Sequence, residues 1–175
     1  MTQTAGRRAG RVMLVLAWGG GLLLATRFFA DWEDNRFNPN REPVSRIEGG
    51  QVEVQLAGNA SGHFVADGRI NGERVTFLLD TGATDVAVPI ELAKRLGLER
   101  GAPVMLQTAN GPSTGYRTRL ARLELGDIVL HDVRAIVAPG FLSEQVLLGM
   151  SALKQLEFTQ RAGTLVLRQS ATDRP

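Results

Sequence analysis

The chain has 175 residues, among them 20 Lys and Arg, 18 Asp and Glu, and no cysteine. The absence of cysteine excludes disulfides, thiolate metal sites and a cysteine nucleophile. With the three arginines of the first 11 residues set aside, 17 basic residues face 18 acidic ones, so the rest of the chain lacks the basic excess of a nucleic-acid-binding domain.

A basic arm and an apolar segment open the chain. The three arginines of the arm precede an apolar run from residue 12 to residue 30, which three glycines and Arg27 interrupt. About 20 apolar residues span a membrane, and flanking basic residues stay on the cytoplasmic side. We therefore expect a cytoplasmic arm at 1–11 and a single-pass transmembrane anchor at 12–30. The remainder would lie outside the cytoplasm, in the periplasm if the host is bacterial. A cleaved signal peptide is the alternative.

Residues 31–48 are polar, contain two prolines and show no apolar period, which predicts a linker. Residues 49–170 are enough for one compact domain, followed by a short tail at 171–175.

The first half of this domain reads as strands. Val52 to Leu56 alternates between apolar and polar residues, and the segments 63–70 and 74–80 are joined by Asn71-Gly72-Glu73, which is a hairpin signal. The second of these two segments ends at Asp80.

The run FLLDTGA at residues 77–83 is the most informative part of the chain, because it carries one carboxylate from an apolar strand into a tight turn. Backbone N–H groups beside Gly82 can reach the oxygens of Asp80 there, an arrangement that suits a catalytic acid. Residues 89–96 then have helical spacing, with Pro89 at the start and Gly97 after the end.

Two hairpins and a second apolar run follow. Residues 106–112 are predicted to form a strand that enters a tip marked by Gly and Pro, with 113–120 as the returning arm, and Gly126-Asp127 is predicted to join the next pair of strands. The apolar run VLLG at 146–149 precedes a short helix at 151–156 and a last strand at 164–168.

The FLLDTGA and VLLG runs, in this order and with a hairpin between them, resemble the retropepsin-like branch of the aspartic proteases. The resemblance covers roughly residues 52–168. It implies a mostly β, single-lobe fold of closed, barrel-like sheets with a flap hairpin and one or two short helices, preceded in this chain by the transmembrane helix.

The resemblance also implies the site residues. Asp80, Thr81 and Gly82 would be catalytic: one Asp80 activates water as a general base, while its protonated partner polarises the scissile carbonyl. The peptide would be bound by Ala83 and by the flap residues Thr108, Ala109, Asn110 and Gly111. In this family the second apolar run, here Leu147, Leu148 and Gly149, lies beside the catalytic loop, and its glycine lets two chain segments cross closely.

The single motif implies a homodimer. The two carboxylates of such a site share one proton, yet the sequence holds no second Asp-Thr-Gly or Asp-Ser-Gly. Two copies of Asp80 that meet across a two-fold axis satisfy the chemistry, and neither a metal nor another cofactor is needed. The expected function is therefore a membrane-tethered aspartic endopeptidase that acts on peptides or proteins. The alternative is a non-catalytic peptide-binding or assembly domain on the same fold.

Two features depart from the family pattern or remain open. In viral relatives an acid shortly after the motif forms an ion pair with an arginine that follows the second glycine. Here the acid is Asp85, but the residue after Gly149 is Met150 and not an arginine. The ion pair is thus missing or replaced, or Asp85 is a solvated turn residue. Arg117, Arg119 and Arg122 form a basic stripe, which indicates either a solvated face or attraction of acidic peptides.

Overall fold

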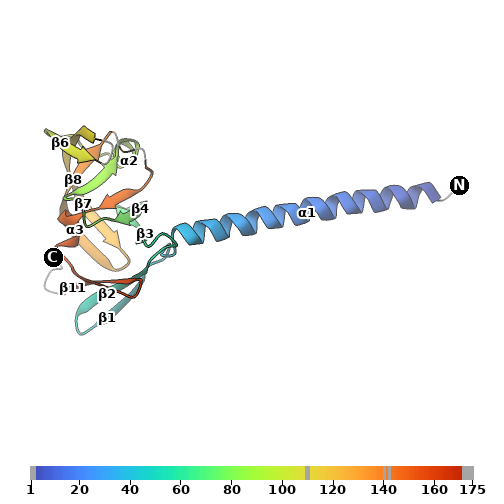
Figure 1. Ribbon diagram of the computed structural model, residues 1–175, viewed down its shortest axis with the longest axis horizontal. Coiled ribbons are helices and arrows are strands. Elements are labelled where there is room, and N and C mark those ends of the chain that lie inside the picture. Colours follow the sequence, from blue (N-terminus) through green and yellow to red (C-terminus); the bar gives the residue numbers. More distant parts are fainter. Residues whose placement is uncertain (1–2, 109–110, 140, 142, 171–175) are drawn as a thin grey trace. The chain divides into compact units, whose positions relative to one another are not determined.

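The computed structural model describes residues 3–108, 111–139, 141 and 143–170, and divides the chain into two units, with the second starting at Asn38 (Figure 1). The tail predicted at 171–175 and the flap residues Ala109 and Asn110 lie outside the described residues.

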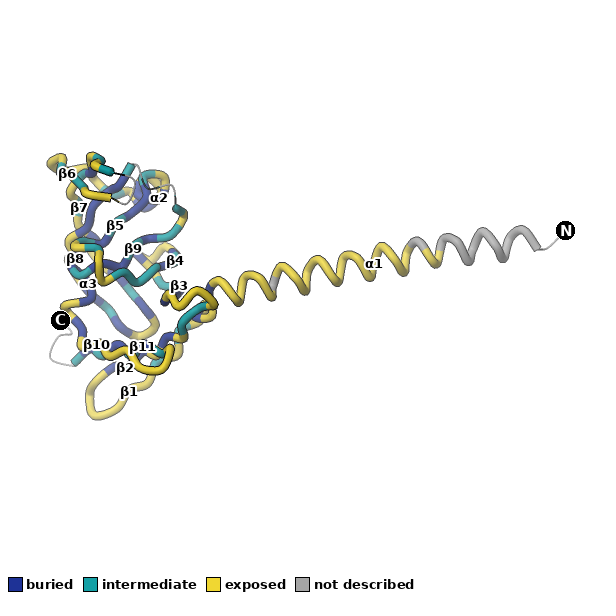
Figure 2. The backbone as a smooth tube through the Cα atoms, in the orientation of Figure 1, coloured by how far each residue is buried: buried dark blue, intermediate teal, exposed yellow. Residues whose placement is uncertain are grey.

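The first unit is α1 (Gln3–Phe37), a continuous helix of 35 residues. Its described side chains are exposed along its length, including Trp18, Leu23 and Phe28 (Figure 2). Within the described part of the chain, no helix has the combined length and apolar character needed to cross a membrane. The transmembrane helix predicted at 12–30 is therefore unsupported.

The linker predicted at 31–48 is wrong, because regular structure fills most of it. Helix α1 continues to Phe37, and β1 (Val44–Glu48) pairs antiparallel with β2 (Gln51–Ala57). Strand β1 is almost entirely exposed, with a single half-buried residue. Its sequence therefore carries no apolar period from which a strand could be predicted.

Asn40, within the same segment, is buried and ties the start of the second unit to two strands. Its Nδ2 donates to the carbonyl oxygens of Ala57 (2.9 Å) and Val65 (2.7 Å), and its Oδ1 accepts from the Ala57 N–H (2.7 Å). Buried backbone groups need such partners, so this asparagine belongs to the folded domain.

Two sheets make up the described part of the second unit. The smaller sheet has the order β1-β2-β11-β10 and is antiparallel throughout, with β10 at Glu157–Arg161 and β11 at Thr164–Ser170. Strand β10 is exposed along its whole length, and the sequence did not predict it for the same reason as β1.

The larger sheet has the order β3-β4-β9-β5-β8-β7-β6, and an additional pairing of β3 with β7 closes it on itself. Its strands are β3 (Val65–Ile70), β4 (Glu73–Leu79), β5 (Val86–Pro89), β6 (Pro103–Thr108), β7 (Gly111–Leu125), β8 (Ile128–Ala138) and β9 (Val146–Leu148). The fold is thus mostly β, as predicted.

The turn signals of the sequence correspond to the observed turns. Asn71 and Gly72 have φ values of 51° and 87°, and this pair of left-handed residues is the form that joins two twisted antiparallel strands. Helix α2 (Ile90–Arg95) begins after Pro89, and Gly97 follows its end with φ 64°. Helix α3 (Met150–Leu153) is shorter than the predicted 151–156.

One hydrophobic core joins the two sheets and the two short helices. Phe77 of β4, Leu56 of β2 and Leu167 of β11 are fully buried within it, and α2 contributes Leu92. Burial of such side chains stabilises the fold by about 1.5–3 kcal/mol each. The packed core fixes the end of β4, and the loop that contains Asp80 extends from this end.

Candidate active site

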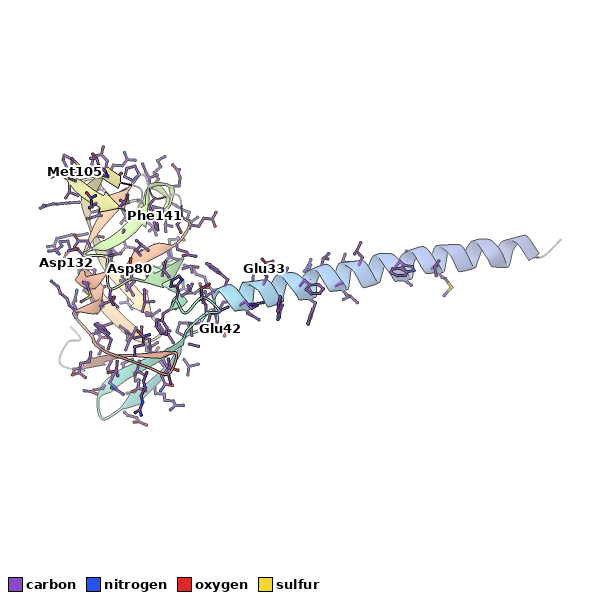
Figure 3. The ribbon with its side chains drawn as sticks, viewed as in Figure 1. Glu33, Glu42, Asp80, Met105, Asp132 and Phe141 are labelled. Carbon is purple, nitrogen blue, oxygen red and sulfur yellow. The ribbon has the colours of Figure 1, made fainter. Side chains whose placement is uncertain are left out.

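Asp80 stands where β4 leaves the sheet. Strand β4 runs parallel to β9, with Leu79 beside Leu148, and the Asp80 N–H donates to the Leu148 carbonyl oxygen at 3.2 Å. The chain then turns, and the Gly82 N–H donates to Asp80 Oδ1 at 2.8 Å. The carboxylate is half-buried and lies in the second unit, as labelled in Figure 3.

Among the described residues, one oxygen of the Asp80 carboxylate accepts a hydrogen bond from the chain itself. Within the described residues, no basic side chain pairs with Asp80, and Oδ2 accepts no hydrogen bond. Thr81 and Gly82 are exposed next to it, and Ala83 is half-buried. The loop therefore presents a positioned acid at an accessible surface, as a group that reacts with substrate requires.

Gly149 sits where two backbone segments cross. A Cβ atom built on it would lie 2.3 Å from the Asp85 carbonyl oxygen and 2.8 Å from the Ala83 carbonyl oxygen. Directly after Gly149, the N–H groups of Met150 and Ser151 donate to the carbonyl oxygens of Ala83 (2.8 Å) and Thr84 (3.0 Å). The segment that ends the VLLG run is thus hydrogen-bonded to the residues that follow Asp80. Only glycine is small enough at position 149, because a Cβ would clash with the backbone of the other segment.

Asp85 is paired within its own chain. Arg134 of β8 donates from Nε to Asp85 Oδ1 at 2.5 Å, and the carboxylate side chain is only 16% exposed. The expected alternatives were a missing pair, a replaced pair or a solvated turn. The structure shows Asp85 paired with Arg134, so Asp85 is not an unpaired, solvated turn residue. The sequence offered no signal for this choice beyond a lone arginine in an apolar strand.

Ser151 is a second residue that sequence reasoning missed. Its buried hydroxyl donates to the Arg134 carbonyl oxygen at 2.7 Å and accepts from the Val86 N–H at 2.9 Å. It therefore fastens β5, β8 and the start of α3 to one another directly after the loop of Asp80.

The flap hairpin is formed by β6 and β7. At its tip Thr108 lies opposite Gly111, and Thr108 Oγ1 donates to the Gly111 carbonyl oxygen at 2.7 Å. Gly111 has φ 102°, a conformation that favours glycine. No hydrogen bond among the described residues joins this tip to the loop of Asp80. Met105, labelled in Figure 3, is an exposed apolar side chain on β6.

The basic stripe of the sequence is divided in the structure. Arg122 donates to Glu124 Oε1 at 2.8 Å, and this hydrogen bond lowers the pKa of the Glu124 carboxyl below its ordinary value. Arg117 and Arg119 lie earlier in β7 and line a groove with Arg134. In the described part of the chain, no group of three His, Asp or Glu side chains is placed to hold a metal ion.

Comparison with known proteins connects these features. The profile of the gag-polyprotein putative aspartyl protease family matches residues 66–155, which include both the loop of Asp80 and the VLLG run. Among solved structures, a retropepsin-like aspartic protease from Rickettsia conorii is similar, with a TM-score of 0.56 and 30% identity over 66% of this chain and 98% of the other. The resemblance predicted from the two motifs is thereby confirmed.

Two curated relatives are also similar. An uncharacterized protein in the cobV 5' region of Sinorhizobium sp is 34% identical over 134 residues, which are 74% of this chain and 58% of the relative. An uncharacterized protein of Rickettsia prowazekii (strain Madrid E) is 30% identical over 108 residues, or 60% of this chain and 46% of the relative. The chain spans about half the length of these two relatives.

Proposed function

The chain belongs to the gag-polyprotein putative aspartyl protease family, and from this premise we propose that it is an aspartic endopeptidase whose active site forms when two copies of Asp80 meet in a homodimer. The observation that carries the proposal is the state of the Asp80 carboxylate. Its Oδ1 accepts from the Gly82 N–H at 2.8 Å, while no hydrogen bond to Oδ2 comes from the described residues.

In the proposed mechanism, a water molecule lies between the two Asp80 carboxylates, which share one proton because two adjacent negative charges are unfavourable. The ionised carboxylate takes a proton from the water, and the water oxygen attacks the scissile carbonyl carbon. The protonated carboxyl donates a hydrogen bond to the carbonyl oxygen and later helps to protonate the leaving amine. Gly82 orients each acid, and Thr81 fixes the two loops against each other.

Peptide binding is assigned to the surface next to this pair. Ala83 keeps the floor of the cleft small, and the flap tip with Thr108 and Gly111 closes over the substrate, together with Ala109 and Asn110. Leu147, Leu148 and Gly149 support the loop from the core through the crossing described above.

A homodimer predicts that an inactive copy suppresses an active one. When wild-type chain is mixed with an equal amount of Asp80→Asn chain and allowed to exchange, random pairing should lower peptide cleavage to about half of the unmixed value at constant wild-type concentration. The rate should also rise more steeply than linearly with concentration where dimers dissociate. Unchanged cleavage after exchange, with linear dependence on concentration, would show that a single copy acts alone.

We further propose that residues 12–30 anchor the domain in a membrane, with residues 1–11 on the cytoplasmic side and the protease domain outside, in the periplasm of a bacterial host. The support comes from the sequence, in which three arginines precede an apolar run, and from the exposed apolar side chains of α1.

The anchor is tested by flotation with phosphatidylcholine vesicles. The full chain should float with the vesicles, whereas a Leu23→Arg/Leu24→Arg variant should stay at the bottom of the gradient, because each central arginine costs about 3 kcal/mol in a spanning helix. A Glu33→Gln variant serves as the control and should float. Recovery of the unaltered chain at the bottom would contradict the anchor, and protection of the domain from protease added to spheroplasts would contradict the orientation.

A further inference from the structure

A basic groove of about 650 Å³ lies between β7, β8 and the loop that follows α2. Four arginines line it, namely Arg100 from the loop, Arg117 and Arg119 from β7, and Arg134 from β8. Among the described lining residues, Glu99 is the single acid and none is aromatic. The groove therefore gathers positive charge in a domain whose sequence is otherwise close to neutral.

The backbone builds the wall of this groove. The Gly101 N–H donates to the Arg117 carbonyl oxygen at 2.8 Å, and the Arg117 N–H donates to the Ala102 carbonyl oxygen at 3.0 Å. A Cβ on Gly101 would lie 2.9 Å from the Arg117 carbonyl oxygen, so the close approach needs glycine. The guanidinium of Arg100 lies 5.6 Å from the centre of the Tyr116 ring, which holds this arginine over the sheet.

The strand register brings two of the arginines face to face. Arg119 of β7 is directly opposite Arg134 of β8, and like charges in this position destabilise a sheet. Core packing does not require the arrangement, since both side chains are exposed, 62% for Arg119 and 51% for Arg134. Local conflicts of this kind are typical of functional sites.

The intrachain partners leave much of this charge available. Arg119 pairs with Asp132, whose side chain is 72% exposed, and such a surface pair contributes little to stability. A carboxylate of a ligand can take the place of Asp132 at small cost. Among the described residues, no acidic side chain pairs with Arg117 or Arg100. Arg134 also forms an ion pair with Asp85. This lining residue therefore connects the groove to the segment that follows the loop of Asp80.

We propose that this groove binds acidic segments of peptides or proteins. Planar guanidinium groups bind carboxylates through two parallel hydrogen bonds, and several of them in one groove match several carboxylates along an extended chain. Single-stranded nucleic acid fits less well, because its binding sites rely on aromatic rings that stack on the bases. The proposal concerns binding and does not depend on proteolysis.

The test uses the full 175-residue chain with Asp80→Asn, so that the probe is not cleaved, and fluorescein-labelled hexaglutamate, followed by fluorescence anisotropy. The probe should bind, and its affinity should fall with added salt. Arg117→Gln/Arg119→Gln should weaken binding at least about tenfold, since each replacement removes charge-assisted hydrogen bonds. The matched control is Arg46→Gln/Arg161→Gln on β1 and β10, which removes the same charge from exposed residues outside the groove.

The control should bind within about twofold of the parent, and circular dichroism establishes that both variants are folded. Absence of hexaglutamate binding, or an equal loss in the two double variants, would overturn the proposal. Unlabelled hexaglutamate should displace the probe at far lower concentration than inorganic phosphate or oligothymidylate. If either of the latter competes equally well, the groove is a general anion site or a nucleic-acid site, and the assignment to acidic peptides is wrong.

Discussion

Replacement of Asp80 by Asn is expected to lower kcat/KM for peptide hydrolysis by about 10³–10⁴-fold, because the amide cannot act as the general base toward water. The fold should persist, since the amide oxygen can still accept the Gly82 N–H that reaches Oδ1 at 2.8 Å. The measurement is mass-spectrometric detection of cleavage in a mixed peptide library, with circular dichroism and sedimentation on the same samples.

Asp127→Asn is the matched control. Asp127 is exposed at the turn between β7 and β8, and its replacement by Asn changes the charge by the same amount as Asp80→Asn does. It should cleave at the wild-type rate. Wild-type cleavage by a folded, dimeric Asp80→Asn variant would remove Asp80 from the mechanism. If wild type and variant bind the same peptides and neither cleaves them, the chain is instead a peptide-binding domain on a protease fold.

Gly149→Ala is expected to destabilise the domain by about 3 kcal/mol and to abolish cleavage. The added methyl would lie 2.3 Å from the Asp85 carbonyl oxygen and 2.7 Å from its carbonyl carbon, both backbone atoms that cannot move without shifting the loop. Overpacking of this kind typically costs about 1–3 kcal/mol, and the backbone contacts place this site at the upper end. The shift would displace the segment that follows Asp80, so activity should fall with stability.

The measurement is urea unfolding followed by circular dichroism, with the cleavage assay in parallel. Gly20→Ala in α1 is the control, because a Cβ there meets nothing within 4 Å, and in a helix the change is favourable by about 0.5–1 kcal/mol. It should leave the unfolding of the domain and the cleavage unchanged. If Gly149→Ala is as stable as wild type, the two backbone segments at Gly149 lie further apart than the 2.3 Å contact of the added methyl implies.

The family was predictable from two short runs because each depends on local chemistry. FLLDTGA combines an apolar strand, an acid and a turn, and VLLG combines an apolar strand with the glycine that a close crossing needs. The profile match across residues 66–155 includes both. The hairpin at Asn71-Gly72 and the end of α2 before Gly97 were equally predictable, since left-handed backbone conformations favour these residue types.

The margins of the domain were not predictable in this way. Strands β1 and β10 are exposed, so they lack the alternation that marks a half-buried strand. Asn40 looked like a linker residue, yet it is buried and satisfies three hydrogen bonds. Polar residues in a proline-containing segment read as a loop unless the partners that cover them are known.

The sequence by itself therefore determined the family, the place of Asp80 in a turn after a strand, and the other turns, because these follow from the residue types and their order along the chain. Only the tertiary structure decided which charges meet. Arg134 is far from Asp85 in the sequence but pairs with it, and it lies opposite Arg119 at the edge of the groove. Such contacts depend on which strands become neighbours and in what register, and the closure of the larger sheet sets both.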